Sequence, residues 1–128
     1  MEVLLYTTET NEAGKRLEKV IKTSLDRLNI RICRTINSLT QKLRQPRDGF
    51  GIAVLLAHSK ESLSEILSLK DLFWNLGIIL ILPDNETDTI SRGHRLYPRF
   101  LSYIDSDFSD VAAVLGKMLN YSKYYNFN

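Results

Sequence analysis

The chain has 128 residues, 44% of them hydrophobic and 25% charged, which is the profile of one ordinary globular domain spanning residues 1–128. Its single cysteine, Cys33, excludes an internal disulfide and favours a reducing, cytoplasmic setting, and no apolar run approaches the roughly 18 residues that span a bilayer. The 17 Lys and Arg residues exceed the 15 Asp and Glu residues by only two, so the charge balance does not favour a nucleic-acid partner.

Five short runs have the length and composition of β-strands. The third and fourth are continuously apolar, which predicts strands buried on both faces of a parallel sheet, whereas the second alternates apolar and polar residues and predicts an edge strand. In chain order the runs are Val3–Tyr6, Ile30–Cys33, Ile52–Ala57, Ile78–Leu82 and Phe100–Ile104.

Helical periodicity fills the segments after each strand. The first helix starts near Glu12 and the second stops at Gln45, with residues 48–49 forming the turn into the third strand. The third is predicted as one helix from Leu63 through Trp74 to Leu76, closed by Gly77.

The last two helices differ in the strength of their signal. The fourth, over residues 86–97, is weakly periodic and polar. The fifth is strongly apolar from Val111 onward, and it is expected to begin with Asp107 as its N-cap and Asp110 three residues later.

Strictly alternating strands and helices predict an α/β three-layer sandwich with right-handed crossovers. The expected sheet has five parallel strands in the order 2-1-3-4-5, with five helices on its two faces. In such a sheet, functional side chains lie at the carboxyl ends of the strands, beside the switch point between the first and third strands.

The residues at these strand ends are mostly uncharged. They are Thr7 and Thr8 after the first strand, Ala57 and His58 at the third, Leu82 at the fourth and Asp105 after the fifth. The element order and size resemble the receiver domain of response regulators along nearly the whole chain. Receivers have an acidic pair, a phosphate-accepting aspartate, a small hydroxyl residue and a lysine at these four strand ends.

This resemblance implies a pseudo-receiver, a receiver scaffold without the phosphorylation residues. Phosphoryl transfer to a carboxylate needs the carboxylate, a divalent cation and a group that holds the product. We therefore expect a phosphorylation-independent signalling domain that is not an enzyme and takes no cofactor or metal.

An alternative function is that of a small flavodoxin-like protein that binds a flavin or a nucleotide. The polar loop after the first strand is similar to the hydroxyl-rich loop by which flavodoxins hold a phosphate, and its ligands would be Thr7, Thr8, Thr10 and Asn11. Glu9 would repel that phosphate, and Thr8 or Thr10 could equally cap the first helix.

Three titratable residues end neighbouring strands. Glu9, His58 and Asp84 could form a metal site or an acid–base group, or they could be unrelated solvated side chains, and the sequence leaves this open.

The expected working surface is a protein interface on the fourth helix, fifth strand and fifth helix, used for a signalling partner or a homodimer. Arg and Tyr are common interface anchors, and the aromatic tail over residues 121–128 either folds onto the core or joins this interface. Five basic residues between Arg31 and Arg47, without an acidic one, add a second indication of docking onto a charged partner. The expected interface residues are Arg92, His94, Arg95, Tyr97, Arg99, Tyr121 and Tyr124.

Overall fold

The computed structural model describes the backbone of residues 2–7, 11–24, 29–47 and 51–125, and the side chains of residues 2–7, 11–23, 30–47 and 51–120. All five predicted strands are present within one or two residues of their expected bounds. They are β1 (Glu2–Tyr6), β2 (Asn29–Cys33), β3 (Gly51–Leu56), β4 (Leu76–Leu82) and β5 (Phe100–Tyr103).

Helices follow each strand. They are α1 (Glu12–Ser24), α2 (Ile36–Arg44), α3 (Lys60–Leu67), α4 (Thr87–Gly93) and α5 (Ser109–Tyr125), with short 3₁₀ helices η1 (Lys70–Leu72) and η2 (His94–Leu96). Two starts are fixed by side-chain caps: Thr35 accepts the Ser38 N–H and Ser59 accepts the Ser62 N–H, each at 3.0 Å. None of the described helices has the length and apolarity needed to cross a bilayer.

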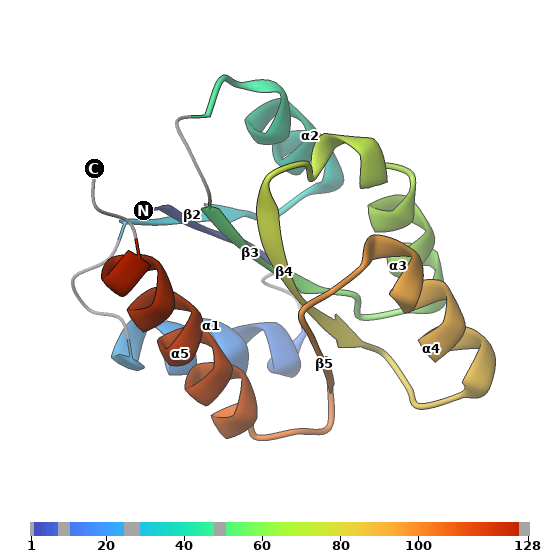
Figure 1. Ribbon diagram of the computed structural model, residues 1–128. Helices are drawn as coiled ribbons and strands as arrows, with labels where there is room; N and C mark the ends of the chain where they lie inside the picture. The colour runs from blue at the N-terminus through green and yellow to red at the C-terminus, as the bar shows by residue number, and fades with distance from the viewer. Residues whose placement is uncertain (1, 8–10, 25–28, 48–50, 126–128) are drawn as a thin grey trace.

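The sheet has the predicted order β2-β1-β3-β4-β5, and every neighbouring pair is parallel. β2 therefore lies at an edge, as its alternating sequence predicts. β1 and β3 are adjacent although β2 separates them in the chain, so the topological switch point lies where expected (Figure 1).

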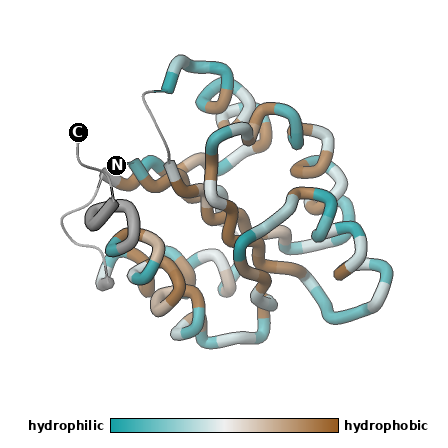
Figure 2. Tube along the Cα trace, viewed as in Figure 1, coloured by the Kyte–Doolittle hydropathy of each residue, from teal (hydrophilic) through white to brown (hydrophobic). Residues whose placement is uncertain are grey.

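Helices cover both faces of the sheet, with α1 and α5 on one face and α2, α3 and α4 on the other (Figure 1). The odd and even residues of each strand therefore enter two separate cores. Leu4 and Leu55 belong to the α2–α3–α4 core, whereas Leu5 and Val54 belong to the α1–α5 core. Apolar residues accordingly run continuously along the central strands (Figure 2), because both faces of these strands are buried.

The prediction for the third helix was wrong. The α-helix ends at Leu67, and Leu76 and Gly77 belong to β4, where they pair with Gly51 and Ile52. The chain turns at Asn75, whose φ of 61° is left-handed, so this asparagine supplies the stop that the sequence analysis assigned to glycine. Apolar residues spaced three or four apart continue through the helix, the 3₁₀ turn and the strand start, so periodicity cannot separate these elements.

Candidate functional site at the carboxyl edge of the sheet

The carboxyl ends of β1 and β3 carry small, uncharged side chains. Thr7 donates its backbone N–H to the Cys33 carbonyl at 3.1 Å, and Ala57 donates its own to the Ile81 carbonyl at 2.9 Å. Both residues are fully buried. Sheet hydrogen bonding thus extends to Thr7 and Ala57, two of the strand-end positions that the sequence analysis compared with the phosphorylation residues of receivers. Neither side chain is an acid. Thr8 lies outside the described residues.

A groove opens between the ends of β4 and β5. Ile104 donates its backbone N–H to the Leu82 carbonyl at 3.0 Å, so the two strand ends remain side by side, and Leu82 itself is fully buried. The groove has a volume of about 490 Å³ and is lined by Pro83, Asp84, Asn85, Tyr103, Ile104 and Asp105. Two acidic side chains, Asp84 and Asp105, therefore line the groove on the β4–β5 side of this edge.

Asp84 is held as a carboxylate at one wall of the groove. Its Oδ1 accepts the Glu86 backbone N–H at 3.0 Å. The Thr89 hydroxyl, followed by this amide, favours the ionised form and holds the pKa of Asp84 below its ordinary value. The groove thus presents a fixed negative charge that suits a basic group rather than a phosphate.

The first residue of α3 and the residue before α4 are joined by an ion pair. The Lys60 ammonium donates to the Glu86 carboxylate, which raises the pKa of Lys60. Arg92 of α4 also donates to the Ser64 hydroxyl of α3. His58, two residues before Lys60, is exposed. The two contacts fasten α4 to α3.

The start of α5 differs in detail from its prediction. The Asp107 carboxylate accepts the Ser109 N–H at 2.9 Å, and this amide lowers the pKa of Asp107. The N-cap position, however, belongs to Phe108, whose carbonyl accepts the Ala112 N–H at 3.0 Å as the first bond of the helix. Asp110 does not complete a capping box. Its carboxylate accepts the hydroxyls of Ser102 at 2.9 Å and Ser106 at 3.1 Å, because the helix packs on β5 and brings those hydroxyls within reach.

Arg16 of α1 fixes the loop between β5 and α5. Its Nη2 donates to the Ile104 carbonyl at 2.6 Å and its Nε to the Ser106 carbonyl at 3.2 Å. Its guanidinium lies over the Phe108 ring, with 4.9 Å between the guanidinium carbon and the ring centre. The cation at this strand end therefore comes from α1 and binds backbone carbonyls.

The residues of the alternative flavin or nucleotide site are only partly described. Asn11 Oδ1 accepts the Gly14 N–H at 2.6 Å, which gives it the role of a helix cap, and Thr7 is fully buried. Thr8, Glu9 and Thr10 lie outside the described residues. In the described part of the chain, no three His, Cys, Asp or Glu side chains are grouped as metal ligands, and His58 and Asp84 belong to no such cluster.

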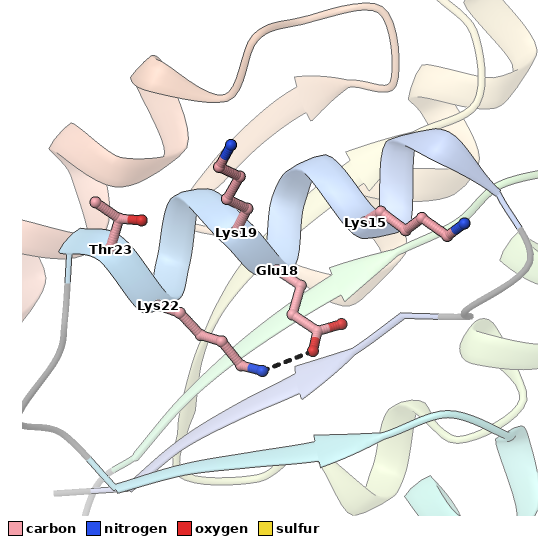
Figure 3. Close-up of a pocket in the computed structure, with 5 residues that line it drawn as sticks. All are labelled: Lys15, Glu18, Lys19, Lys22 and Thr23. Carbon is pink, nitrogen blue, oxygen red and sulfur yellow. Dashed lines mark hydrogen bonds and ion pairs between the residues drawn. The ribbon is translucent and has the colours of Figure 1, made fainter.

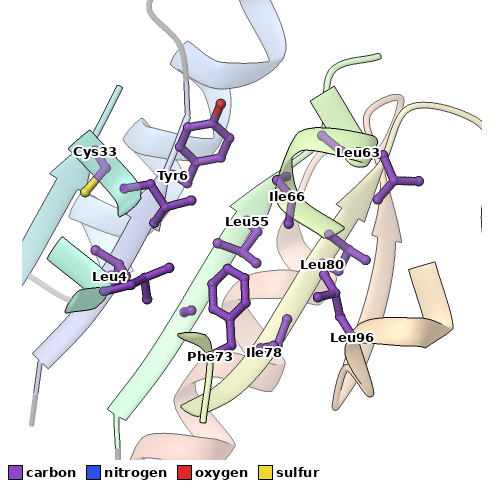
Figure 4. Close-up of a cluster of buried hydrophobic side chains, with 14 of the residues drawn as sticks. Leu4, Tyr6, Cys33, Leu55, Leu63, Ile66, Phe73, Ile78, Leu80 and Leu96 are labelled. Atoms are coloured by element: carbon purple, nitrogen blue, oxygen red, sulfur yellow. The ribbon is translucent and has the colours of Figure 1, made fainter. Parts of the chain in front are cut away.

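Two buried polar groups lie in the α2–α3–α4 core. Tyr6 at the end of β1 and Cys33 at the end of β2 are both almost fully buried, and burial raises the pKa of each. Figure 4 shows both side chains at the β1–β2 side of this core. The Cys33 thiol is therefore protonated at neutral pH and is a poor nucleophile.

A second, shallow concavity of about 400 Å³ lies on α1. Figure 3 shows the residues that line it: Lys15, Glu18, Lys19, Lys22 and Thr23. Glu18 accepts from Lys22 at 2.9 Å and receives a bidentate pair from Arg34 at 3.0 and 3.1 Å. The Glu18 carboxylate thus neutralises part of the basic surface.

The basic stretch from Arg31 to Arg47 is largely occupied within the molecule. Arg34 binds Glu18, Lys42 pairs with Glu2 at 3.1 Å, and Arg47 binds backbone carbonyls. Arg31 and Arg44 are exposed. Because three of its five cations bind other parts of the chain, this stretch offers less charge to a docking partner than its composition indicates.

The predicted interface residues divide into three groups. His94, Arg95, Tyr97 and Arg99 are exposed where α4 ends and β5 begins, whereas Arg92 is half-buried against α3. The side chains of Tyr121 and Tyr124 lie outside the described residues. Sequence analysis also missed Trp74, which it placed on an apolar helix face and which is 62% exposed.

Comparisons with known proteins define the fold. No protein-family model and no curated protein matches the sequence. A response regulator from Thermotoga maritima superposes with a TM-score of 0.68 at 11% identity, covering 94% of this chain and 98% of that one. A response regulator receiver protein from Pseudoalteromonas atlantica gives 0.69 at 13% identity, covering 95% and 99%. The receiver-like fold expected from the sequence is thus confirmed.

Proposed function

We propose that this chain is a cytoplasmic signalling domain that binds a protein partner without being phosphorylated and without acting as an enzyme. The observation that carries the proposal is the chemistry at the ends of β1 and β3, where Thr7 and Ala57 are fully buried and uncharged. Phosphoryl acceptance needs a carboxylate nucleophile, and a buried methyl group at the end of β3 offers none.

Contacts within the chain hold the loops at the carboxyl edge in place, which supports a docking surface that does not depend on phosphorylation. Arg16 binds the two carbonyls of the β5–α5 loop, and Lys60 pairs with Glu86 in the segment before α4. Each contact is made within the chain and needs no bound phosphate. Docking is therefore constitutive in this proposal, and partner abundance regulates it.

The proposed docking surface is formed by α4, β5 and α5, the face that carries output in receivers. Its occupant is a signalling protein or a second copy of the chain. Arg95 and Tyr97 are exposed at one end of this face, and both residue types are frequent interface anchors.

Phosphorylation is tested directly by incubation with a small phosphodonor and magnesium, followed by mass spectrometry. We expect no acid-labile phosphoprotein, whereas a stoichiometric adduct would refute the proposal. Self-association is tested by light scattering over a concentration series, on the full chain and on a chain truncated after Lys123. Strictly monomeric behaviour of both, together with no partner captured through this face, would exclude the docking surface.

A further inference from the structure

Two aromatic side chains stand out at the amino edge of the sheet, opposite the groove. Trp74 is 62% exposed and Tyr97 is 89% exposed, and they are the exposed large apolar side chains of the described residues. Trp74 shortly precedes β4 and Tyr97 shortly precedes β5. Because β4 and β5 are neighbouring parallel strands, both aromatics lie at the same edge.

Each exposed ring follows a buried anchor. Phe73 and Leu96, the residues directly before Trp74 and Tyr97, are both buried in the α2–α3–α4 core. Figure 4 shows Phe73, Ile78 and Leu96 at one end of this core and Tyr6 at the other. The two outer rings are therefore attached to a rigid base, which lowers the entropy lost when they bind a ligand.

The Trp74 indole is further positioned by Arg47. The Arg47 guanidinium donates to the carbonyls of Leu43 at 2.9 Å, Leu72 at 3.1 Å and Trp74 at 2.8 Å. Its carbon also lies 4.9 Å from the centre of the indole. One face of the ring is thus stacked on a cation, and the high exposure of Trp74 leaves the other face to solvent.

Tyr97 is presented by an unusual backbone conformation. Its φ of 50° and ψ of 53° are left-handed, which is rare for a bulky residue. The turn is held by bonds on both sides, from the Tyr97 N–H to the His94 carbonyl at 3.0 Å and from the Arg99 N–H to the Ile78 carbonyl at 2.8 Å. The ring consequently projects into solvent instead of returning to the core.

Exposed basic side chains lie on the described segments that end or begin at this edge of the sheet. Of the described acidic residues there, Asp71 is exposed and Glu2 is paired with Lys42. The exposed basic residues are Arg44, Lys70, His94, Arg95 and Arg99. Among the described residues of this edge, exposed basic side chains therefore outnumber exposed acidic ones.

We propose that this amino-edge surface binds single-stranded nucleic acid, with bases stacked on Trp74 and Tyr97 and phosphates beside Arg44, Lys70 and Arg95. Separate aromatic platforms among cations are the arrangement that reads a strand without regard to sequence, since every base offers a flat π-face. Arg95 and Tyr97 also lie at one end of the proposed docking face, whereas Trp74, Arg44 and Lys70 lie outside it and extend the exposed aromatic and basic surface along the amino edge. The proposal goes beyond the protein-docking function and does not depend on it.

The test uses a fluorescein-labelled oligothymidylate of about a dozen nucleotides and the purified full chain. Trp74 is the only tryptophan, so its emission reports directly on stacking. We expect saturable binding by anisotropy, quenching of Trp74 in parallel, and a steep loss of affinity with added salt. A duplex of the same length should bind more weakly, because its bases are already stacked.

Matched substitutions separate stacking from simple charge attraction. Trp74→Leu and Tyr97→Leu should each weaken binding about tenfold, whereas Trp74→Phe and Tyr97→Phe should retain most of it. Lys19→Ala, on α1, is the charge control and should change little. Circular dichroism of every variant confirms that it is folded.

Several results would overturn the proposal. They are no binding, saturation without Trp74 quenching, and Leu variants that bind within about twofold of the unsubstituted chain. Poly-L-glutamate that binds as tightly and also depends on Trp74 would assign the surface to an acidic protein partner. A phosphoprotein adduct would refute the proposed function without affecting this result.

Discussion

The guanidinium carbon of Arg16 lies 4.9 Å from the centre of the Phe108 ring, and this contact joins α1 to the residue that precedes α5. Phe108 is fully buried and has a left-handed φ of 65°. The same guanidinium binds the carbonyls of Ile104 and Ser106. The Arg16 side chain thus holds the β5–α5 loop in place through two hydrogen bonds and one ring contact.

Arg16→Ala should lower the free energy of unfolding by about 2 kcal/mol. The substitution removes two charge-assisted hydrogen bonds and the contact with Phe108, and partial exposure of Arg16 limits the loss. Urea denaturation measures the difference. Lys15→Ala, an exposed neighbour on the same helix, should stay within about 0.5 kcal/mol of the unsubstituted chain. Equal urea midpoints for the two variants would contradict the role given to Arg16.

Arg47→Ala should destabilise the protein by about 2–3 kcal/mol, because three backbone carbonyls lose their donor and Trp74 loses its stacking partner. The emission of Trp74 should change in the native state as well, since its surroundings change. The control is Arg44→Ala, which removes an exposed arginine at the end of α2. A native emission spectrum identical in all three proteins would argue against the Arg47–Trp74 contact.

Tyr97→Gly should leave stability unchanged or raise it by up to about 1 kcal/mol. Glycine adopts the left-handed conformation without strain, and the exposed ring contributes little burial. Tyr97→Val should instead destabilise, because a β-branched residue fits this conformation poorly. Thermal unfolding of the pair decides the point, and a Gly variant less stable than the Val variant would exclude strain at Tyr97.

Glu18→Gln should make stability less dependent on pH. Arg34, followed by Lys22, lowers the pKa of Glu18 in the folded state. A lowered carboxyl pKa contributes stability above the unfolded value of about 4.3, and this contribution is lost as the pH falls through the folded value. The variant should therefore be about 1 kcal/mol less stable at pH 7, with the difference closing in acid.

Unfolding of both proteins at a series of pH values measures this difference. Glu12→Gln is the control, because the Glu12 side chain is 92% exposed and its ion pair with Arg16 is 3.7 Å long. It should have little effect at any pH. A gap between Glu18→Gln and the unsubstituted chain that stays constant down to pH 2 would contradict the assignment.

The strand order and the placement of the strand-end residues could be predicted from local pattern alone. Continuous apolar runs such as Ile78–Leu82 mark buried parallel strands, and alternation with helices leaves few topologies. Thr7, Ala57 and Leu82 then lie at one edge because parallel strands end together. Local pattern failed where one spacing suits two structures, as between Leu67 and Gly77, where a helix, a turn and a strand share the same apolar period.

The sequence by itself therefore determined the strands and the uncharged residues that end β1 and β3, since each is set by a local run, and the alternation with helices left few ways to order those strands in a sheet. Only the tertiary structure decided which charged side chains are paired within the molecule and which aromatic rings are exposed. Arg16 meets Ser106 across 90 positions, and Arg47 meets Trp74 across 27. Contacts at such separations depend on how the helices pack on the sheet. That packing leaves Trp74, which the sequence analysis placed on an apolar helix face, exposed at the surface.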